Sequence, residues 1–446
     1  MNVKSSETTR RGFLKDIGKA AVVLAAGPAA MRAAEKTPRK PNVIVILTDD
    51  QGSVDMNCYG AKDLITPNMD ALAKRGVRFG QFYAGAPVCS PSRASLLTGR
   101  YPQRAQLASN AGRRGMPASQ LTMAEVFKSA GYRTALFGKW HLGEDLAMSP
   151  NAQGFDEFLG HKVGCIDNYS HFFYWSGPNR HDLWKDTKEH FEDGTYFPDI
   201  MVREAARFIT DNAKRPFFLF LPFNTPHYPL QGEQKFVKMY AKMKDIKRKR
   251  YASFVTSLDD KIGQVIATVD KLKLRDDTII IFQSDHGHSV EVRTFGGGGS
   301  AGPYRGHKFT CWEGGLRVPA IISWPGRIPQ GKVRNQVACS IDWLATVAEY
   351  CKLPAIKTRI DGKSLSGVIE SSAAPSPHKT LHWSACGMWA VREGKWKLVG
   401  GKSAGLFLSD MDADVTETKN LAKEHPDVVT RLKRLHQEWS KEVVTQ

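Results

Sequence analysis

The chain has 446 residues, of which 41% are hydrophobic and 24% are charged, so it is long enough for one large domain with a smaller one. It contains no run of about 18 uncharged apolar residues, and we expect no transmembrane segment in it. The formal net charge of +18 indicates a polyanionic partner, but no zinc knuckle, helix-turn-helix or aromatic RNA-binding signature accompanies it, so we expect no nucleic acid among the partners.

Residues 1–34 have the pattern of a twin-arginine export signal. Arg10 and Arg11 precede Phe-Leu-Lys, and a mildly apolar run over 20–30 leads into small residues. A basic amphipathic helix at the start of the chain is the alternative interpretation. The export signal predicts passage through the twin-arginine export machinery and a periplasmic or secreted location.

Between residues 41 and 368, short apolar runs alternate with helical patterns. The apolar runs, typical of buried strands, cover 42–47, 133–138, 216–223, 278–284 and 317–324. The helical patterns cover 69–76, 122–131, 199–213, 250–272 and 340–353. Runs that are apolar on both faces predict an α/β fold with a large, mostly parallel central sheet flanked by helices. In such sheets the functional site lies beyond the carboxyl ends of the strands.

The pattern changes near residue 375. Short runs broken by glycine over 380–410 predict an antiparallel sheet, and 427–442 predict a closing helix. Residues 369–379 have the composition of a linker. The sequence therefore predicts a main domain over 41–368 and a small C-terminal α+β subdomain over 376–446.

One stretch, CSPSRASLLTG, places a lone cysteine at the threshold of a helix expected over 92–97. Pro91 suits the first helical turn, and Gly99 suits the end of the helix. Cys89 therefore lies where unpaired N–H groups and the positive end of the helix dipole favour a nucleophile or an anion. A buried structural cysteine is the alternative.

Polar side chains follow four of the predicted strands, and one more lies in a loop. They are Asp49 and Asp50, Lys139 and His141, His227, Asp285 and His286, and, in the loop, Lys308. A carboxylate at a strand end is often a cap, and a lone histidine is often an ordinary loop residue. Four strand ends of this kind are not explained by capping alone, so we expect a shared site.

The charges of these residues fall into two groups. The carboxylates of Asp49, Asp50 and Asp285 offer the oxygen ligands that a hard divalent cation prefers, and adjacent aspartates repel unless they are neutralised. The positive group consists of Arg93, Lys139 and Lys308. Beside a metal ion these cations exceed what the carboxylates need, which predicts a bound anion of the phosphate or sulfate type. The histidines offer proton transfer near neutral pH.

The stretch CSPSRASLLTGR resembles the Cys-x-Pro-x-Arg signature of the type I, formylglycine-dependent sulfatases, which are arylsulfatase-like members of the alkaline phosphatase superfamily. The resemblance covers nearly all of residues 41–446. In order, it includes the paired aspartates, the signature, GKWHLG, a histidine after a proline, Asp-x-Gly, the lysine loop and the C-terminal sheet. It implies an alkaline-phosphatase-like fold and sulfuric ester hydrolysis.

The resemblance also implies a modified nucleophile. Cys89 would be oxidised to formylglycine (3-oxoalanine) by a formylglycine-generating enzyme or by an anaerobic sulfatase-maturing enzyme. The aldehyde hydrates to a gem-diol, and one hydroxyl attacks sulfur and displaces the sugar alcohol. The second hydroxyl then loses its proton, so that sulfate leaves and the aldehyde re-forms.

By the same resemblance, five residues would hold one Ca²⁺ ion: Asp49, Asp50, modified Cys89, Asp285 and His286. Arg93 and Lys139 would steady the formylglycine, and His141 would be the base for the second hydroxyl. His227 and Lys308 would hold the sulfate, with His227 as the acid to the leaving group. Many family members have asparagine in place of His286, and nitrogen is a poorer calcium ligand than oxygen, which weakens the prediction of calcium.

Export and basic charge favour a sulfated polysaccharide or oligosaccharide as the substrate over a small aryl sulfate. The aromatic, histidine-rich segment 161–184 either lines a sugar site or packs conventionally. The candidate substrate contacts are His171, His288, Glu291, Arg293 and Arg305. Two alternatives remain: a phosphonate monoester or phosphodiester hydrolase of the same superfamily, and a catalytically inactive protein that binds sulfated glycans.

Overall fold

The computed structural model describes residues 39–294, 296–402 and 404–444, and the chain divides into two units, Met1–Lys40 and Pro41–Gln446. The predicted export signal, residues 1–34, lies outside the described residues. Within the described ranges, no helix is long and apolar enough to cross a membrane. All the described helices and strands belong to the second unit.

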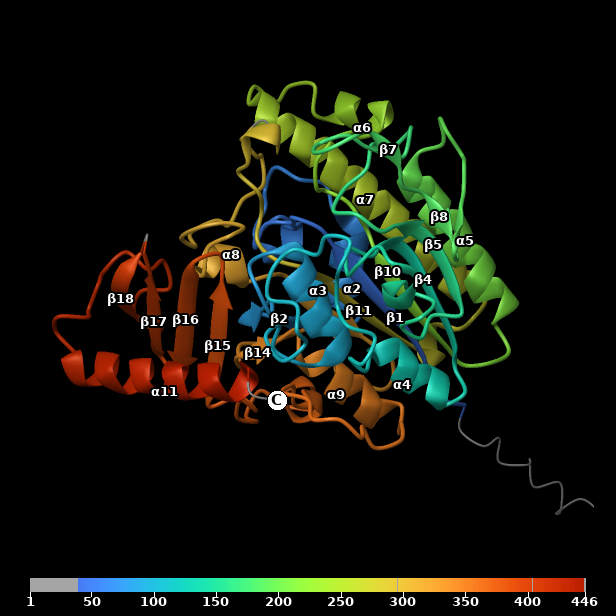
Figure 1. Cartoon of the computed structure of the whole chain (residues 1–446). Helices are drawn as coiled ribbons and strands as arrows, with labels where there is room; N and C mark the ends of the chain where they lie inside the picture. The colour runs from blue at the N-terminus through green and yellow to red at the C-terminus, as the bar shows by residue number, and fades with distance from the viewer. Residues whose placement is uncertain (1–38, 295, 403, 445–446) are drawn as a thin grey trace, which may run out of the picture. The chain divides into compact units, whose positions relative to one another are not determined.

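A ten-stranded sheet runs through the second unit, in the order β13-β2-β12-β11-β1-β10-β4-β5-β8-β9 (Figure 1). The five central strands are parallel: β11 (Thr278–Ser284), β1 (Asn42–Thr48), β10 (Phe217–Pro222), β4 (Arg133–Lys139) and β5 (Glu157–His161). The outer strands pair mostly antiparallel: β12 (Ala320–Ser323), β2 (Val77–Phe79), β13 (Lys332–Arg334), β8 (Trp184–Lys185) and β9 (Lys188–Glu189). The predicted mostly parallel sheet is therefore confirmed, with antiparallel edges.

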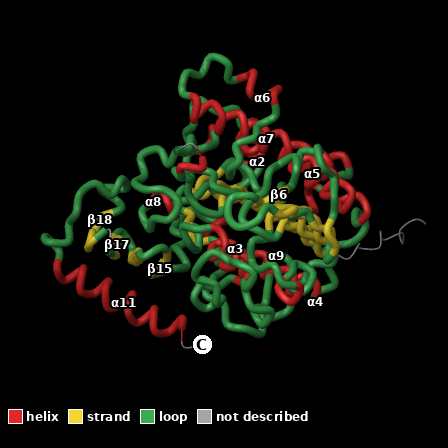
Figure 2. Tube along the Cα trace, turned by 45° about the horizontal axis from the view of Figure 1, so that its top comes forward, coloured by secondary structure: helices red, strands yellow, loops and turns green. Residues whose placement is uncertain are grey.

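Alternate residues of β1 explain why helices cover both faces of this sheet. Val43, Val45 and Leu47 belong to one hydrophobic core, whereas Ile44 and Ile46 belong to the other. The first core includes residues of α3 (Cys89–Thr98), α4 (Met123–Ser129), α9 (Asp342–Tyr350) and α10 (Ser366–Glu370). The second includes residues of α2 (Pro67–Lys74), α5 (Phe197–Asp211) and α7 (Ile246–Lys271). Figure 2 shows the strands of the sheet between these two groups of helices.

A separate four-stranded antiparallel sheet follows near the C-terminus, as predicted (Figure 1). Its elements are β15 (Thr380–Ala385), β16 (Met388–Glu393), β17 (Trp396–Gly401), β18 (Gly405–Asp410) and the packed helix α11 (Pro426–Val444). Val391 and Leu398 share a core with Val428 and Leu432 of α11. The indole N–H of Trp383 donates to the backbone oxygen of Ala84 at 2.8 Å, which ties the small sheet to the rest of the unit.

Shorter elements lie in the connections. They are β3 (Phe82–Tyr83), β14 (Ala338–Cys339), β6 (Phe172–Phe173), β7 (Arg180–His181), α6 (Gln234–Met239), α8 (Glu313–Leu316), η1 (Asn57–Tyr59), η2 (Leu146–Met148), η3 (Arg275–Asp277) and η4 (Val292–Thr294). Two helices begin earlier than predicted. Helix α3 already includes Cys89, and α7 begins at Ile246 because the Asp245 carboxylate accepts from the N–H groups of Lys247 and Arg248.

Candidate active site

Four neighbouring parallel strands end at one edge of the large sheet. Because β11, β1, β10 and β4 are adjacent and parallel, their carboxyl ends meet there. This edge brings together, all buried, Asp285, His286, Asp49, Asp50, His227, Lys139 and His141. Lys308 reaches the same place from the loop between β11 and α8, where its N–H donates to the backbone oxygen of His288 at 2.9 Å.

Cys89 is the first residue of α3, and it is buried against this edge. Its Sγ lies 3.2 Å from Nε2 of His286 and 3.9 Å from Oδ1 of Asp49. The helix is fastened to the sheet by Ser92, whose hydroxyl donates to the backbone oxygen of Asp285 at 2.5 Å. Cys89, at the N-terminus of α3, therefore lies beside the polar residues at the ends of the strands.

One group of ligand atoms is close enough to hold a metal ion. The atoms of Asp49, Asp50, Cys89 and His286 all lie within 4.8 Å of one another, and all four residues are buried. Asp285 borders this group, because its Oδ1 lies 3.5 Å from Nε2 of His286. Asp50 has a φ of 62°, and strained backbone of this kind concentrates at functional sites.

Three buried cations balance the three carboxylates. The closest pairs are Lys139 Nζ with Asp49 Oδ2 at 2.5 Å, Arg93 Nη2 with Asp285 Oδ2 at 3.0 Å, and Lys308 Nζ with Asp50 Oδ1 at 3.0 Å. The formal charges of these six groups cancel. A divalent cation added to them leaves positive charge in excess, which an anion such as sulfate balances.

The same cations act on the thiol of Cys89. Burial raises its pKa, but Lys139 and Lys308 outweigh burial and bring the pKa of Cys89 down to about 6. Negative charge on this side chain is therefore stabilised at neutral pH.

The surroundings of the three carboxylates shift their pKa values in different directions. Burial raises the pKa of Asp50 to about 7 and that of Asp285 to about 6, against the opposing effect of His286 on both. Burial also acts on Asp49, but Lys139 and other cations outweigh it and hold the pKa of Asp49 well below its usual value. A divalent cation would replace the protons that these raised pKa values favour. Three carboxylates fit the predicted calcium ion, whereas the nitrogen of His286 and the unmodified sulfur of Cys89 suit it less well.

Two buried histidines complete the polar groups. Nδ1 of His227 lies 2.8 Å from the backbone oxygen of Tyr228, and its Nε2 lies 3.7 Å from Oδ2 of Asp50. Nδ1 of His141 is buried with no hydrogen-bond partner among the described residues, and His141 has a φ of 55°. Burial holds the pKa of both histidines well below the usual value, so both rings are neutral at pH 7.

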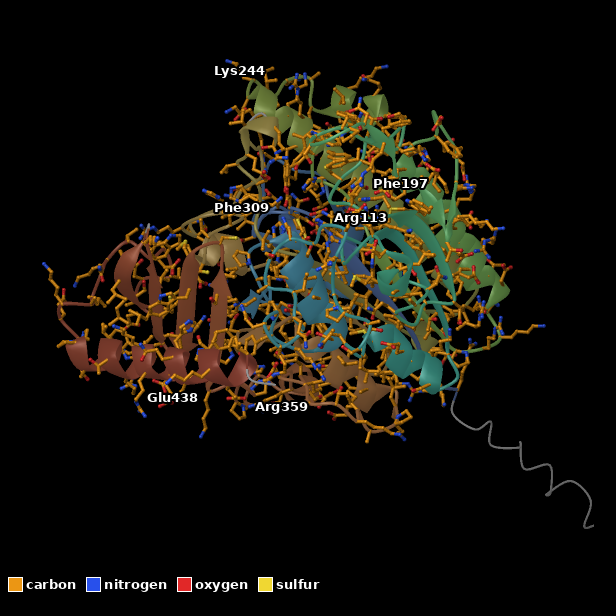
Figure 3. All side chains as sticks on the ribbon, in the orientation of Figure 1. Arg113, Phe197, Lys244, Phe309, Arg359 and Glu438 are labelled. Carbon is orange, nitrogen blue, oxygen red and sulfur yellow. The ribbon has the colours of Figure 1, made fainter. Side chains whose placement is uncertain are left out.

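A cavity of about 580 Å³ reaches Cys89, His141, His227 and Lys308. The other residues that line it are Asn110, Ala111, Gly112, Glu144, Val163, Gly164, Cys165, Phe173, Ser176, Gly177, Pro178, Arg180, Tyr228, Glu291, Arg293 and Phe309. Several of them come from segment 161–184, which therefore lines the cavity. Figure 3 labels Phe309, one of its aromatic residues.

The structure brings two of the five predicted substrate contacts to this cavity. Glu291 and Arg293 line it, and Nε of Arg293 lies 3.2 Å from Oε1 of Glu291. The other three are directed elsewhere. Arg305 stacks on an indole ring at 3.8 Å, His288 packs beside another histidine ring, and His171 is fully buried away from the cavity.

Two charged residues of the cavity were missed by the sequence interpretation. Nη1 of Arg180 lies 2.9 Å from Oε2 of Glu144, and the guanidinium lies 5.4 Å from the ring centre of Phe173. Glu144 directly follows the GKWHLG motif, and this position beside predicted site residues could have identified it from the sequence. Arg180 lies on the β6–β7 hairpin, and only tertiary structure brings that hairpin to the cavity.

The family model described as Sulfatase matches residues 41–353. The chain is 33% identical to the steryl-sulfatase of Mus musculus, over 83% of this chain and 71% of that protein. It is 33% identical to the N-acetylgalactosamine-6-sulfatase of Canis lupus familiaris, over 76% of this chain and 67% of that protein. Among solved structures, it is similar to Ps i-CgsB in complex with k-i-k-neocarrahexaose, with a TM-score of 0.83 and 30% identity, over 90% of this chain and 93% of that one.

Proposed function

The chain belongs to the sulfatase family and is a sulfuric ester hydrolase, and from this premise we propose that it removes sulfate from a sulfated carbohydrate with Cys89 oxidised to formylglycine. The observation that carries the proposal is the position of Cys89. It lies at a helix N-terminus and lines the cavity, between three buried carboxylates and three buried cations. We assign this chemistry to a catalytic domain over 41–368, with 376–446 as its C-terminal subdomain.

The thiol sulfur of Cys89 stands in for the oxygen that the oxidised side chain would carry. In the formylglycine form, the hydrated aldehyde would supply one hydroxyl as the nucleophile and a second whose deprotonation allows the sulfate to leave. The lowered pKa of Cys89 supports this role, because cations that stabilise a thiolate also stabilise a developing oxyanion.

Asp49, Asp50, Asp285 and His286 would hold the calcium ion together with the modified Cys89. When bound, the ion supplies positive charge that polarises a sulfate oxygen and lowers the pKa of a hydroxyl. Nδ1 of His286 lies 2.9 Å from the backbone oxygen of Gly287, an arrangement that fixes the tautomer and leaves Nε2 as a ligand.

The remaining polar residues would divide the work of charge and proton transfer. Lys139 and Arg93 hold the aspartates and would stabilise negative charge at Cys89. Lys308 lines the cavity and would bind the sulfate group. His141 is neutral and has an unpartnered Nδ1, so it would accept the proton of the second hydroxyl.

His227 would donate a proton to the leaving oxygen of the sugar. Burial keeps its pKa low, so the ring is neutral without substrate. A sulfate ester bound beside it brings negative charge, and this charge raises the pKa of an imidazole. Substrate binding would therefore favour the protonated form of His227, which is the acid that the reaction needs.

The charged walls of the cavity support a carbohydrate in preference to a sterol. The Arg293–Glu291 and Arg180–Glu144 pairs offer donors and acceptors for hydroxyl groups, and either arginine would bind a second anionic group. A sterol would cover these four charged groups without offering them hydrogen bonds in place of the water that it displaces. The likeness to Ps i-CgsB, a structure determined with neocarrahexaose, also supports an oligosaccharide.

The rings of Phe173, Tyr228 and Phe309 add apolar faces to these walls. The guanidinium of Arg293 lies 5.3 Å from the ring centre of Tyr228, so an aromatic face and a charge stand side by side. A sugar ring, which is apolar on its faces and polar at its rim, matches such a wall.

The proposed location of the protein rests on the sequence of residues 1–34. A twin-arginine signal would place the protein in the periplasm or outside the cell. Its partners would then be the export machinery and a formylglycine-generating or anaerobic sulfatase-maturing enzyme.

Mass spectrometry of the tryptic peptide 79–93, from protein produced with a formylglycine-generating enzyme, tests the modification. We expect a peptide lighter by the change from thiol to aldehyde, and reactive with a hydrazide. Full sulfate release by protein with an unmodified thiol would overturn the formylglycine mechanism.

Ester hydrolysis by the modified protein is then compared on sulfated oligosaccharides, a steroid sulfate, and matched aryl sulfate and aryl phosphonate esters. The proposal predicts the highest kcat/KM for an oligosaccharide. A higher value for the steroid sulfate or the phosphonate would reject the substrate class. Retention of sulfated glycans without any sulfate release would show a binding protein instead.

A further inference from the structure

We propose a second metal site, for a divalent transition metal ion such as Zn²⁺, formed by His171, His181 and Asp193. It is separate from the aspartate cluster at Cys89, and it stands whether or not the proposed substrate is correct. The three ligand atoms all lie within 4.8 Å of one another. Oδ1 of Asp193 lies 3.9 Å from Nδ1 of His171 and 3.8 Å from Nε2 of His181.

The two histidines direct unpartnered nitrogens toward this point. Nδ1 of His171 and Nε2 of His181 are buried and have no hydrogen-bond partner among the described residues. The side chains are 0% and 4% exposed, so water does not satisfy them from the surface. A buried polar atom without a partner is destabilising, and a bound cation would remove that cost.

The opposite nitrogen of each ring has a hydrogen-bond acceptor. Nε2 of His171 lies 3.0 Å from the backbone oxygen of Thr195, and Nδ1 of His181 lies 3.0 Å from Oε1 of Glu189. When these nitrogens carry the protons, the lone pairs of the other two face Asp193. Metal-binding histidines usually have this arrangement, with a carbonyl or a carboxylate holding the second N–H.

The donor set indicates the kind of ion. Two imidazoles and one carboxylate suit zinc and its neighbours, whereas calcium prefers oxygen ligands throughout. A tetrahedral ion with bonds of about 2.0–2.1 Å holds its ligand atoms about 3.4 Å apart. The observed separations are slightly wider, and the Asp193 carboxylate, whose side chain is 60% exposed, is able to move inward.

The rings themselves are held by aromatic packing. His181 stacks on Phe191, with ring centres 4.3 Å apart and planes at 14°. His171 meets Phe197, labelled in Figure 3, edge to face at 6.2 Å. Two of the three ligands are therefore preorganised, which lowers the entropy lost on metal binding.

The site would brace one wall of the active-site cavity. His171 directly precedes β6 and His181 ends β7, and the same hairpin carries Phe173 and Arg180, which line the cavity. An ion bound to His171, His181 and Asp193 would join the base of the hairpin to the following loop. The position of Arg180 relative to substrate would then depend on this ion.

The test uses Co²⁺ as a spectroscopic probe on the full chain, stripped of metals and then supplied with excess Ca²⁺ to occupy the aspartate cluster. We expect one equivalent of Co²⁺ to bind with the intense visible absorption of a tetrahedral ion, and Zn²⁺ to displace it. His181→Gln and Asp193→Asn should each weaken Co²⁺ binding by about tenfold to a hundredfold. His190→Gln is the matched control, because His190 lies in the same segment and pairs with Glu192 instead.

Asp193 is largely exposed, so Asp193→Asn is expected to fold, and far-ultraviolet circular dichroism without metal checks this. Zn²⁺ should raise the thermal midpoint of the wild type and of His190→Gln, and not that of Asp193→Asn. The proposal is overturned if Co²⁺ fails to bind, or if it binds all four proteins alike.

Discussion

Replacing Lys397 with methionine tests how the C-terminal sheet is held against α8, which follows the loop that carries Lys308. Nζ of Lys397 lies 2.9 Å from Oε1 of Glu313 and 2.9 Å from Oε1 of Glu417, and all three side chains are fully buried. Methionine fills similar space but leaves the two carboxyl groups without the lysine. Breaking a buried ion pair in this way costs about 3–5 kcal/mol, so we expect the free energy of unfolding to fall by that amount.

The loss should depend on pH in a defined direction. Burial already raises the pKa of Glu417 to about 7, with Lys397 opposing, and removal of Lys397 raises it further. Glu313 keeps Arg317 at 3.3 Å, so Glu417 is the group that takes up the proton. The folded variant then holds a proton that the unfolded chain releases above its ordinary pKa of 4.5. The contribution of Glu417 to the free energy of unfolding is therefore greatest below pH 4.5, and it is lost as the pH rises through 7 to the raised pKa of the folded variant.

Urea unfolding at pH 5.5 and pH 8 measures both effects. The control is Lys395→Met, because Lys395 is 48% exposed and pairs with Asp410 at the surface, a kind of pair worth about 1 kcal/mol or less. A loss in Lys397→Met no larger than in the control would refute the reasoning. A loss that grows toward acid pH would refute the assignment of the proton to Glu417.

Four further predictions concern the active site. Cys89→Ala should abolish sulfate release with the thermal midpoint unchanged, and turnover near that of the wild type would exclude Cys89 as the nucleophile. Asp285→Asn should weaken calcium dependence and rate together by about tenfold or more, whereas an unchanged response to chelator would remove Asp285 from the ligands. His227→Ala should slow sugar sulfates by about 10²–10⁴ and aryl sulfates less, because an aryl leaving group needs no proton; equal losses would reject the acid role. Arg293→Ala should raise KM more for a disulfated than for a monosulfated oligosaccharide, and equal KM changes would place the second anion elsewhere.

The central strands of the large sheet were predictable because a strand that is buried on both faces is a continuous apolar run in the sequence. Residues 43–47 are apolar at every position, and they became most of β1, with its neighbours parallel on both sides. Whether an edge strand pairs parallel or antiparallel is not visible in its own sequence. β12 is as apolar as β1, yet it pairs antiparallel with β11. β8 and β9 have two residues each and exist only through pairing with β5 and with each other.

The core of the site was predictable for a related reason. Residues after parallel strands are placed by the strand itself, so Asp49 and Asp285 meet although 236 positions separate them. Loop residues have no such constraint. Arg305 is three residues from Lys308 in sequence, but its guanidinium stacks on Trp312 while Lys308 turns into the cavity. Proximity in sequence to a site residue therefore did not predict contact with substrate.

The charge balance of the site links its two expected ligands. Without a metal ion, Lys139 and Lys308 each pair with one of the adjacent aspartates, so both lysines are already engaged. If the aspartates instead hold calcium, the attraction that keeps the lysines on them is weakened. Lys308, which lines the cavity, then becomes available to an anion there, and the buried Lys139 adds positive charge behind it. An anion bound by the lysines in turn leaves the aspartates more negative toward calcium. Binding free energies of this kind are reciprocal, so calcium and a sulfate group should each strengthen the binding of the other by the same factor. The six buried charges would thus make the site receptive to a sulfate ester mainly when the metal ion is present.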